Sequence, residues 1–247
     1  MSRTESARDR LAVALDVPDL ARAEALIDSL AGVPGWLKVG GELFTAAGPA
    51  ALVAAGRAAK VFLDTKLHDI PNTVARTVAA AARHGVSMMT LHGGGGSAML
   101  SAARESADAV AAETGVSPPL LLAVTVLTSF SSSALEEVGV DATVDDQVAR
   151  LVDLAVVAGL DGVVASSHEA AAVRRRAGDA LRIVTPGIRP ADWLRDDQAR
   201  AASAGDAIAS GSDVLVVGRP VLTAADPAAA ARRIVAEIEA ALGPRQA

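Results

Sequence analysis

Eight short apolar segments recur along the sequence, and alanine-rich stretches with helical spacing of their apolar residues lie between them. Most of the eight are apolar at nearly every position, which is typical of strands in a parallel sheet covered by helices. Eight is also the number of parallel strands that closes a barrel. The sequence therefore predicts an α/β fold, a single (β/α)8 TIM barrel over residues 1–247. The expected strands are residues 11–17, 36–40, 60–66, 87–92, 120–127, 162–166, 182–187 and 214–219.

The length of the chain agrees with one such domain. Barrels of this class typically have about 250 residues, and this chain has 247, of which 51% are hydrophobic. No low-complexity linker or block of charge divides the sequence, and the polar residues 1–10 are expected to form an N-terminal extension. The widest gap between strands, residues 188–213, contains a polar stretch that suits a lid over the site.

Composition limits the class of partner. A net charge of -6 with only 2% aromatic residues argues against a nucleic-acid partner, which would require a basic surface and stacking rings. The absence of cysteine excludes disulfides and thiolate metal sites, and it fits a reducing compartment. No apolar stretch approaches the roughly 20 residues that cross a bilayer, and the polar start is a poor signal peptide. We expect a cytoplasmic protein that acts on a small molecule, without a membrane partner.

Polar residues gather where the expected strands end. In parallel barrels the loops after the strands form the active-site face, so these residues are the first candidates for function. They include two carboxylates, two lysines and two arginines. The candidates are Asp16, Lys38, Asp64, Lys66, His92, Thr128, Ser129, Ser166, Ser167, Pro186, Gly187, Arg189, Gly218 and Arg219.

The third strand ends in a charged pair. Asp64 and Lys66 are two residues apart, so a regular strand would direct both side chains to the same face, with Lys38 of the second strand beside Asp64. An ammonium flanked by carboxylates stays protonated, which predicts Lys66 as a general acid. A structural ion pair is the alternative for Asp64 and Lys66 alone. Adding Lys38 and Asp69 favours catalysis, because buried ion pairs often stabilise little more than apolar packing does.

A second group predicts a phosphate site. Gly218 and Arg219 follow the eighth strand, where exposed backbone N–H groups and a guanidinium can bind oxyanions. Residues 186–189 and Gln198 strengthen this interpretation. The run HGGGGS at 92–97 lacks the Gly-Lys-Ser/Thr ending of a P-loop and is interpreted as a turn. His68, His92 and His168 lack a metal-binding spacing, so no metal site is predicted.

Several sequence blocks then resemble one family. DTKLHDIPNT at 64–73 resembles the D-x-K-x-x-D-I-P-N-T signature of the orotidine 5'-phosphate decarboxylase family, in its bacterial form. Further blocks resemble that family in the expected order: ALDV (14–17), LKVGGELF (37–44), TVLTS (125–129), TPGIRP (185–190), DDQ (196–198) and VVGRP (216–220). The resemblance implies a carboxy-lyase that converts orotidine 5'-phosphate to uridine 5'-phosphate, the last step of de novo UMP synthesis. It also implies that neither a metal nor a cofactor is needed.

The resemblance assigns roles to individual residues. It implies that Lys38, Asp64, Lys66 and Asp69 form an alternating charge network, in which Lys66 protonates C6 of the pyrimidine as carbon dioxide leaves. Asp64 would lie against the substrate carboxylate, and Asp69 and Thr73 would reach the neighbouring site of a homodimer. The remaining implied contacts are Asp16 and Lys38 to ribose hydroxyls, Thr128 and Ser129 to the pyrimidine edge, Pro186 to the substrate, and Arg189, Gln198, Gly218 and Arg219 to the phosphate and its lid.

Two alternatives stay open on the sequence. A metal-dependent sugar-phosphate decarboxylase or synthase of the same superfamily also carries D-x-K-x-x-D, but the IPNT extension and the 186–198 block disfavour it. A non-catalytic nucleotide-binding barrel is the other alternative. The charged cluster contains every member that catalysis would need, which argues against that second interpretation.

Overall fold

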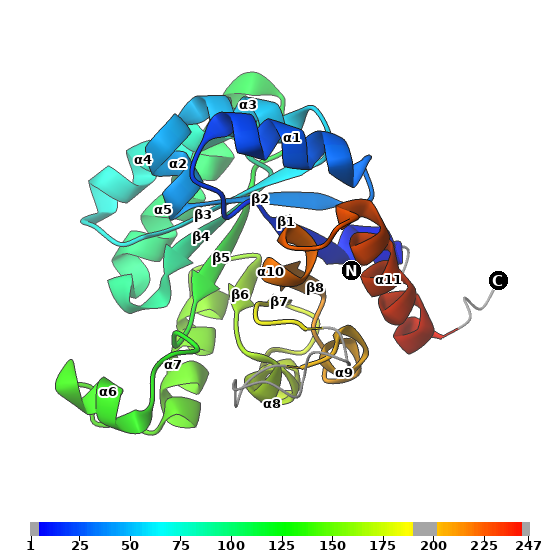
Figure 1. The fold of residues 1–247 in the computed structure, drawn as a ribbon. Coiled ribbons are helices and arrows are strands. Elements are labelled where there is room, and N and C mark those ends of the chain that lie inside the picture. The colour runs from blue at the N-terminus through cyan, green and yellow to red at the C-terminus, as the bar shows by residue number, and fades with distance from the viewer. Residues whose placement is uncertain (1–4, 190–201, 244–247) are drawn as a thin grey trace.

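The computed structural model describes residues 5–189 and 202–243. Within them eight parallel strands pair in chain order and close into a barrel, which confirms the predicted fold (Figure 1). The strands are β1 (Leu11–Ala14), β2 (Trp36–Gly40), β3 (Lys60–Leu67), β4 (Met88–His92), β5 (Leu120–Val124), β6 (Gly162–Val164), β7 (Arg182–Thr185) and β8 (Val214–Val217). Several predicted runs extend past these ends, so the residues that close them lie in loops.

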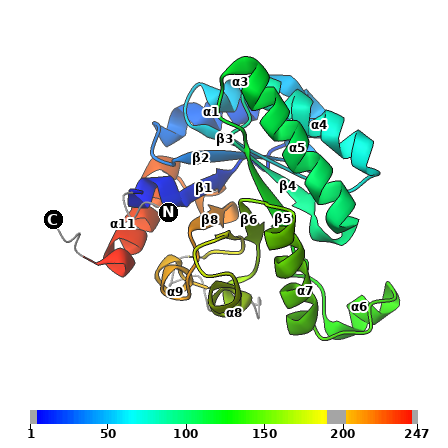
Figure 2. The same cartoon turned by 180° about the vertical axis from the view of Figure 1, so that it is seen from behind.

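Helices surround the strands on the outside of the barrel (Figures 1 and 2). The α-helices are α1 (Leu20–Leu30), α2 (Gly41–Ala47), α3 (Pro49–Gly56), α4 (Pro71–Arg83), α5 (Gly96–Thr114), α6 (Ser132–Glu137), α7 (Val144–Val157), α8 (Ser167–Ala177), α9 (Ala204–Ala209), α10 (Arg219–Leu222) and α11 (Pro227–Leu242). Two 3-10 helices, η1 (Ala7–Arg10) and η2 (Gly93–Gly95), complete the order. In the described part of the chain, no helix has the length and hydropathy needed to cross a membrane.

The core has two compartments. The larger one lies between the strands and the helices, and the smaller one fills the inside of the barrel. The inner compartment includes Ala12, Trp36, Phe62 and Met88. Phe62 pairs with Met88 in the register of β3 and β4, so these two inward side chains lie at the same height in the barrel. Because side chains alternate along a strand, the residue two positions after each of these also points into the barrel. The inner core therefore determines which residues reach the open end.

The first described residues pack against the amino-terminal end of the barrel. Ser6 caps η1, Gly35 N–H donates to the carbonyl of Arg8 at 2.9 Å, and the indole N–H of Trp36 donates to the carbonyl of Asp9 at 2.8 Å. Glu5 forms a two-point ion pair with Arg182 at the start of β7. Thus Glu5–Arg10, which the sequence placed in a polar extension, contact the barrel in this structure.

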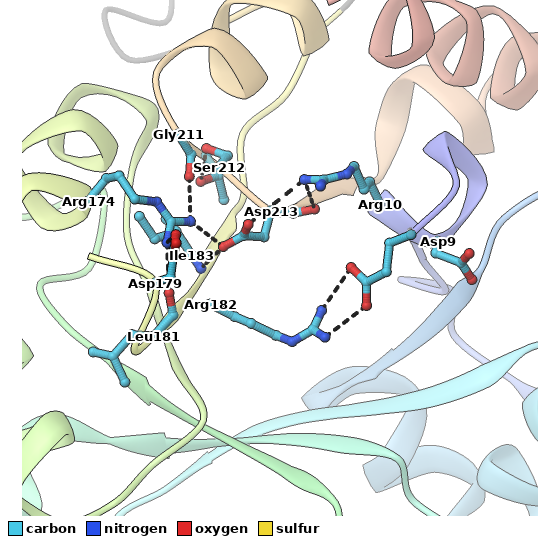
Figure 3. A network of polar contacts seen from close by, with 12 residues as sticks. Asp9, Arg10, Arg174, Asp179, Leu181, Arg182, Ile183, Gly211, Ser212 and Asp213 are labelled. Atoms are coloured by element: carbon cyan, nitrogen blue, oxygen red, sulfur yellow. Dashed lines mark hydrogen bonds and ion pairs between the residues drawn. The ribbon is translucent and has the colours of Figure 1, made fainter. Parts of the chain in front are cut away.

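A polar network at the same end joins β7, β8 and α8 (Figure 3). The Asp213 carboxylate accepts from the Ile183 N–H at 2.8 Å and from Arg174, and Arg10 lies 3.8 Å away. Asp161 repeats this arrangement before β6, where it accepts from the Leu121 N–H and from Arg104 of α5. In both places one carboxylate ties a strand to its neighbour and to a covering helix.

We expect Asp213→Ala to lower the free energy of unfolding by about 2 kcal/mol, because a partly buried charge-assisted network loses its acceptor. Asp179 is the matched control, since its carboxylate is 3.7 Å from the same Arg174 but 90% exposed. Asp179→Ala is expected to change stability by less than about 0.5 kcal/mol. Denaturant unfolding measures both variants, and equal losses would contradict a special role for Asp213.

Candidate active site

A cavity of about 350 Å3 opens at the carboxyl ends of the strands, a volume within the range of about 300–1,000 Å3 that is common for small-molecule sites. The residues that line it continue the series of inward-pointing side chains that begins in the barrel core. Asp16 follows Ala12 and Ala14 at every second residue, Lys38 follows Trp36, and Asp64 follows Phe62. The polar residues that line it are Asp16, Lys38, Asp64, Lys66, Thr128, Ser166, Arg189 and Arg219, with Pro186, Gly187 and Gly218 between them.

Four of these side chains form a chain of alternating charge. Lys38 Nζ lies 3.2 Å from Asp16 Oδ1 and 3.4 Å from Asp64 Oδ2. Lys66 Nζ lies 2.9 Å from the other oxygen of Asp64, Oδ1. The side chain of Lys38 is 9% exposed, whereas that of Lys66 is 40% exposed. The buried lysine is thus held between two carboxylates, and the outer lysine can meet a ligand.

Asp64 remains a carboxylate in this setting. Burial raises the pKa of Asp64, but Lys38, Lys66 and the hydrogen bonds from Lys66 and Thr90 more than offset it, so that the pKa lies below its ordinary value. Asp64 is thus the acceptor that both Lys38 and Lys66 contact. Within this chain the second carboxylate beside Lys38 is Asp16; the resemblance implied that Asp69 would come from a neighbouring subunit.

A bulge in β3, and not regular strand geometry, brings the Asp64 and Lys66 side chains together. The β3–β4 register passes from Leu63 opposite Met89 to Leu67 opposite Leu91, so three residues of β3 oppose one residue of β4. Lys66 has a left-handed backbone with φ 48°. The expectation that both side chains reach the same place is correct, but the regular alternation that motivated it ends at Asp64. Bulges commonly redirect side chains next to active sites.

Gly40 leaves room for the inner lysine. A Cβ atom at Gly40 would lie 3.0 Å from Asp16 Oδ1 and 3.1 Å from Lys38 Nζ, tighter than ordinary contact. The register places Gly40 opposite Asp64, at the level of the charged cluster. A larger residue here would shift the Asp16 and Lys38 side chains, so the absence of a side chain at Gly40 helps to keep this ion pair in place.

Two arginines line the part of the cavity that follows β7 and β8, across the closed barrel from β3. Arg189 follows β7 and Arg219 begins α10 after β8, and both line the cavity with Gly187 and Gly218. Burial, and then the positive charge of Arg219, lowers the pKa of Arg189. Two guanidinium groups that face one cavity favour an anion between them, because it offsets their repulsion and accepts hydrogen bonds from both. A phosphate has that chemistry.

Apolar side chains make up much of the remaining lining. They include Val124, Val164, Val184, Val216 and Phe62. A flat ring can pack against such a surface while its polar substituents reach the charged groups of the cavity. The cavity thus suits a phosphorylated ligand with a planar, partly apolar centre and an anionic group near Lys66.

The match to known proteins covers most of the chain. Residues 9–234 match the Orotidine 5'-phosphate decarboxylase / HUMPS family. The chain belongs to this family. An orotidine 5'-phosphate decarboxylase of Moorella thermoacetica is 51% identical over 235 residues, which are 94% of this chain and 93% of that protein. The same enzyme of Halorhodospira halophila is 52% identical, over 94% of this chain and 97% of that one.

Solved structures agree with this family membership. The crystal structure of orotidine 5'-phosphate decarboxylase from Lactobacillus acidophilus superposes with a TM-score of 0.83 at 36% sequence identity. It covers 93% of this chain and 99% of that chain. The fold of this chain therefore matches that of a relative whose structure is known.

Not every residue that the decarboxylase resemblance implied lies in the cavity of this chain. Asp69 and Thr73 are exposed at the start of α4 and do not line it, and Asp69 Oδ1 accepts from the N–H of Ile70. Ser129 is exposed in the loop after β5, next to Thr128, which does line the cavity. Gln198 lies outside the described residues, as does much of the expected lid.

The histidines have local structural contacts. His68 and His92 stack with ring centroids 5.0 Å apart, and His92 Nδ1 accepts from the N–H of Gly94. Burial, then His68 and Lys66, lowers the pKa of His92. The glycine run after His92 forms η2 and the start of α5, which agrees with the predicted turn. In residues 5–189 and 202–243 no group of three His, Cys, Asp or Glu residues could hold a metal.

Sequence reasoning missed two residues that shape the family's charged cluster here. One is Gly40. The other is Thr90, whose hydroxyl contacts both Asp64 and the backbone of Lys66. A signal for Thr90 was available, because it is a polar residue two positions after the inward-facing Met88 in an otherwise apolar run.

Proposed function

We propose that the protein decarboxylates orotidine 5'-phosphate to uridine 5'-phosphate, and that Lys66 donates the proton to C6. The observation that carries this proposal is the position of the Lys66 ammonium, held 2.9 Å from Asp64 in a cavity that two arginines also line. Family membership and relatives at about half identity support the same reaction.

The chemistry requires a fixed cation. When the bond between C6 and the carboxylate breaks, the electron pair stays on C6 in an orbital that the pyrimidine ring cannot delocalise. Enzymes lower barriers by roughly 8–23 kcal/mol, and only groups that interact more strongly with the developing charge than with the substrate contribute to this. The Lys66 ammonium can stabilise that electron pair and then give it a proton, which forms the C6–H bond and leaves a neutral amine for solvent to reprotonate.

Asp64 has two roles in this proposal. Its carboxylate orients Lys66, because it accepts a hydrogen bond from the Lys66 ammonium at 2.9 Å. It would also face the substrate carboxylate, and two like charges about 4 Å apart repel by on the order of 4 kcal/mol at an effective dielectric of 20. That repulsion disappears as neutral carbon dioxide leaves.

The remaining contacts hold the substrate. Asp16 and Lys38 are proposed to bind the ribose hydroxyls, and Thr128, Ser129 and Pro186 the pyrimidine. The phosphate would lie between Arg189 and Arg219 beside Gly218, with Gln198 completing that end. Binding energy from a phosphate far from C6 can be used to order the charged cluster.

The direct test adds purified protein to orotidine 5'-phosphate with a chelator present and follows the loss of near-ultraviolet absorbance. Turnover that survives the chelator supports cofactor-independent decarboxylation. Turnover that needs added Mg2+ would favour the metal-dependent sugar-phosphate enzyme class, although the relatives named above are orotidine 5'-phosphate decarboxylases. No turnover under either condition would remove the proposed function.

We further propose a homodimer in which Asp69 and Thr73 complete the neighbouring site, with the activity in the cytoplasm. Asp69 and Thr73 are exposed at the start of α4, and between them Ile70 exposes 64% of its surface. An apolar residue beside a carboxylate at the rim of the barrel suits a contact between copies. The resemblance in the 64–73 block supports this sharing.

Mixed dimers test the sharing of residues. Lys66→Ala and Asp69→Ala proteins should each be inactive alone, whereas mixed subunits form one intact site per mixed dimer. Random mixing of equal amounts should therefore restore about a quarter of wild-type activity, because half of the dimers are mixed and each has one working site of two. Absence of any recovery, with mixed dimers verified by mass, would contradict a shared site.

A further inference from the structure

Thr90 makes two hydrogen bonds inside the charged cluster, although it does not line the cavity itself. It lies in the middle of β4 and is fully buried. Its hydroxyl oxygen accepts from the backbone N–H of Lys66 at 2.9 Å, and its hydroxyl hydrogen is donated to Asp64 Oδ1 at 3.0 Å. A hydroxyl has one hydrogen to donate, and here that hydrogen points at the carboxylate that holds Lys66.

The backbone of Lys66 needs such a partner. In the described residues only Ala31 and Lys66 have positive φ among the non-glycines. Ala31 ends α1, where a left-handed residue is common, whereas Lys66 lies within a strand. A side-chain-bearing residue persists in this conformation only where its surroundings determine it, because it is less stable than the regular conformation by about 1–2 kcal/mol.

Thr90 occupies the position that the bulge leaves open. Asp64, Thr65 and Lys66 stand opposite this one residue of β4, since the pairs on either side are Leu63 with Met89 and Leu67 with Leu91. In place of a regular ladder bond, the N–H of Lys66 therefore donates to the Thr90 side chain. The Thr90 hydroxyl thus satisfies the backbone N–H that the bulge leaves without a ladder partner.

We propose that Thr90 is a positioning residue for the proton donor, because its hydroxyl joins the backbone of Lys66 to the same Asp64 oxygen that binds the Lys66 ammonium. The contacts form a closed ring: Lys66 N, Thr90 Oγ1, Asp64 Oδ1 and Lys66 Nζ. With Oδ1 occupied in this way, Oδ2 faces Lys38. The hydroxyl therefore determines both the direction of the Lys66 side chain and the rotation of the Asp64 carboxylate.

This inference rests on the proposed function, and it makes a separate prediction. Thr90→Val keeps the shape of the side chain and removes both hydrogen bonds. We expect kcat to fall by about 10- to 100-fold, while KM for orotidine 5'-phosphate and the affinity for uridine 5'-phosphate change less than about threefold, because the phosphate contacts are untouched. Thr90→Ser restores the hydroxyl and should recover most of kcat.

The pH profile adds a readout that loose packing alone would not change. The Thr90 hydrogen bond is one of the contributions that lower the pKa of Asp64. The charged groups around Asp64 are Lys38 from β2 and Lys66 from β3, with Asp16 beyond Lys38 and the His68–His92 pair beyond Lys66. Loss of the hydroxyl raises the pKa of Asp64, so the acidic limb of kcat/KM should move to higher pH in Thr90→Val and stay in place in Thr90→Ser.

Thr125→Val is the matched control. Thr125 is also a buried threonine, but its hydroxyl donates to the carbonyl of Val164, which the Thr125 N–H also reaches, and not to a member of the charged cluster. We expect wild-type kcat and pH profile for it, with folding of every variant checked by thermal unfolding. If Thr90→Val does not fold, Thr90→Cys replaces it with the same expectations, since a thiol is a weak donor and acceptor.

Three results would overturn the role of Thr90. One is wild-type kcat in Thr90→Val, another is an equal fall of kcat in Thr125→Val, and the third is a fall in Thr90→Val that Thr90→Ser does not recover. A wild-type protein that does not release carbon dioxide from orotidine 5'-phosphate would instead remove the proposed function, so the two failures are distinguishable.

Discussion

Lys66→Ala is expected to reduce kcat by at least about 10^3-fold, because the variant loses both the proton donor and the cation that faces the developing charge at C6. Uridine 5'-phosphate should still bind, since Arg189 and Arg219 follow β7 and β8 and not the strand that carries Lys66. Single-turnover decay of orotidine 5'-phosphate absorbance measures the rate, and calorimetric titration with uridine 5'-phosphate measures the affinity.

Lys60 supplies the control for this experiment. It begins the same strand that carries Lys66, but its ammonium is 3.8 Å from Asp9 and 5.0 Å from the centre of the Trp36 ring, at the closed end of the barrel. Lys60→Ala should keep wild-type kcat. If Lys66→Ala retained activity within tenfold of wild type, Lys66 would not be the proton donor.

The strand pattern of the sequence was sufficient to predict the barrel and the end at which the site lies. Each strand has a two-residue period, so an inward core residue such as Phe62 predicts that Asp64 is inward as well. The position of Lys38 beside Asp64 follows from pairing of neighbouring strands, and the structure has it at 3.4 Å. These features come from regular backbone geometry, which a single sequence can reveal.

Irregular backbone and tertiary hydrogen bonds were not predictable in this way. Nothing about a lysine favours the left-handed conformation of Lys66, which depends on the bulge in β3 and on Thr90 in the neighbouring strand. Likewise, the sequence could not show that Asp16 is the second carboxylate beside Lys38 within one chain, because that contact depends on how far the first loop turns inward. Such features arise when tertiary contacts override local preference.

The second prediction with a large expected effect concerns Arg219 at the proposed phosphate site. Arg219→Ala should weaken uridine 5'-phosphate binding by about 100-fold, the effect of losing a charge-assisted hydrogen-bonding pair, and should leave the affinity for uridine nearly unchanged. Arg57 is the control, since its guanidinium pairs with Glu24 on the exposed surface and does not line the cavity. An equal loss for nucleotide and nucleoside would mean that Arg219 does not bind the phosphate.

The same variant shows whether phosphate binding assists the chemical step. If binding energy at Arg219 orders the charged cluster, kcat/KM for orotidine 5'-phosphate should fall at least as much as the affinity does, because the interaction also stabilises the transition state. Turnover of orotidine, which lacks the phosphate, should be slow in wild type and equally slow in Arg219→Ala. A further loss with orotidine in the variant would instead indicate that Arg219 supports the fold of the site, since that substrate offers the guanidinium no partner.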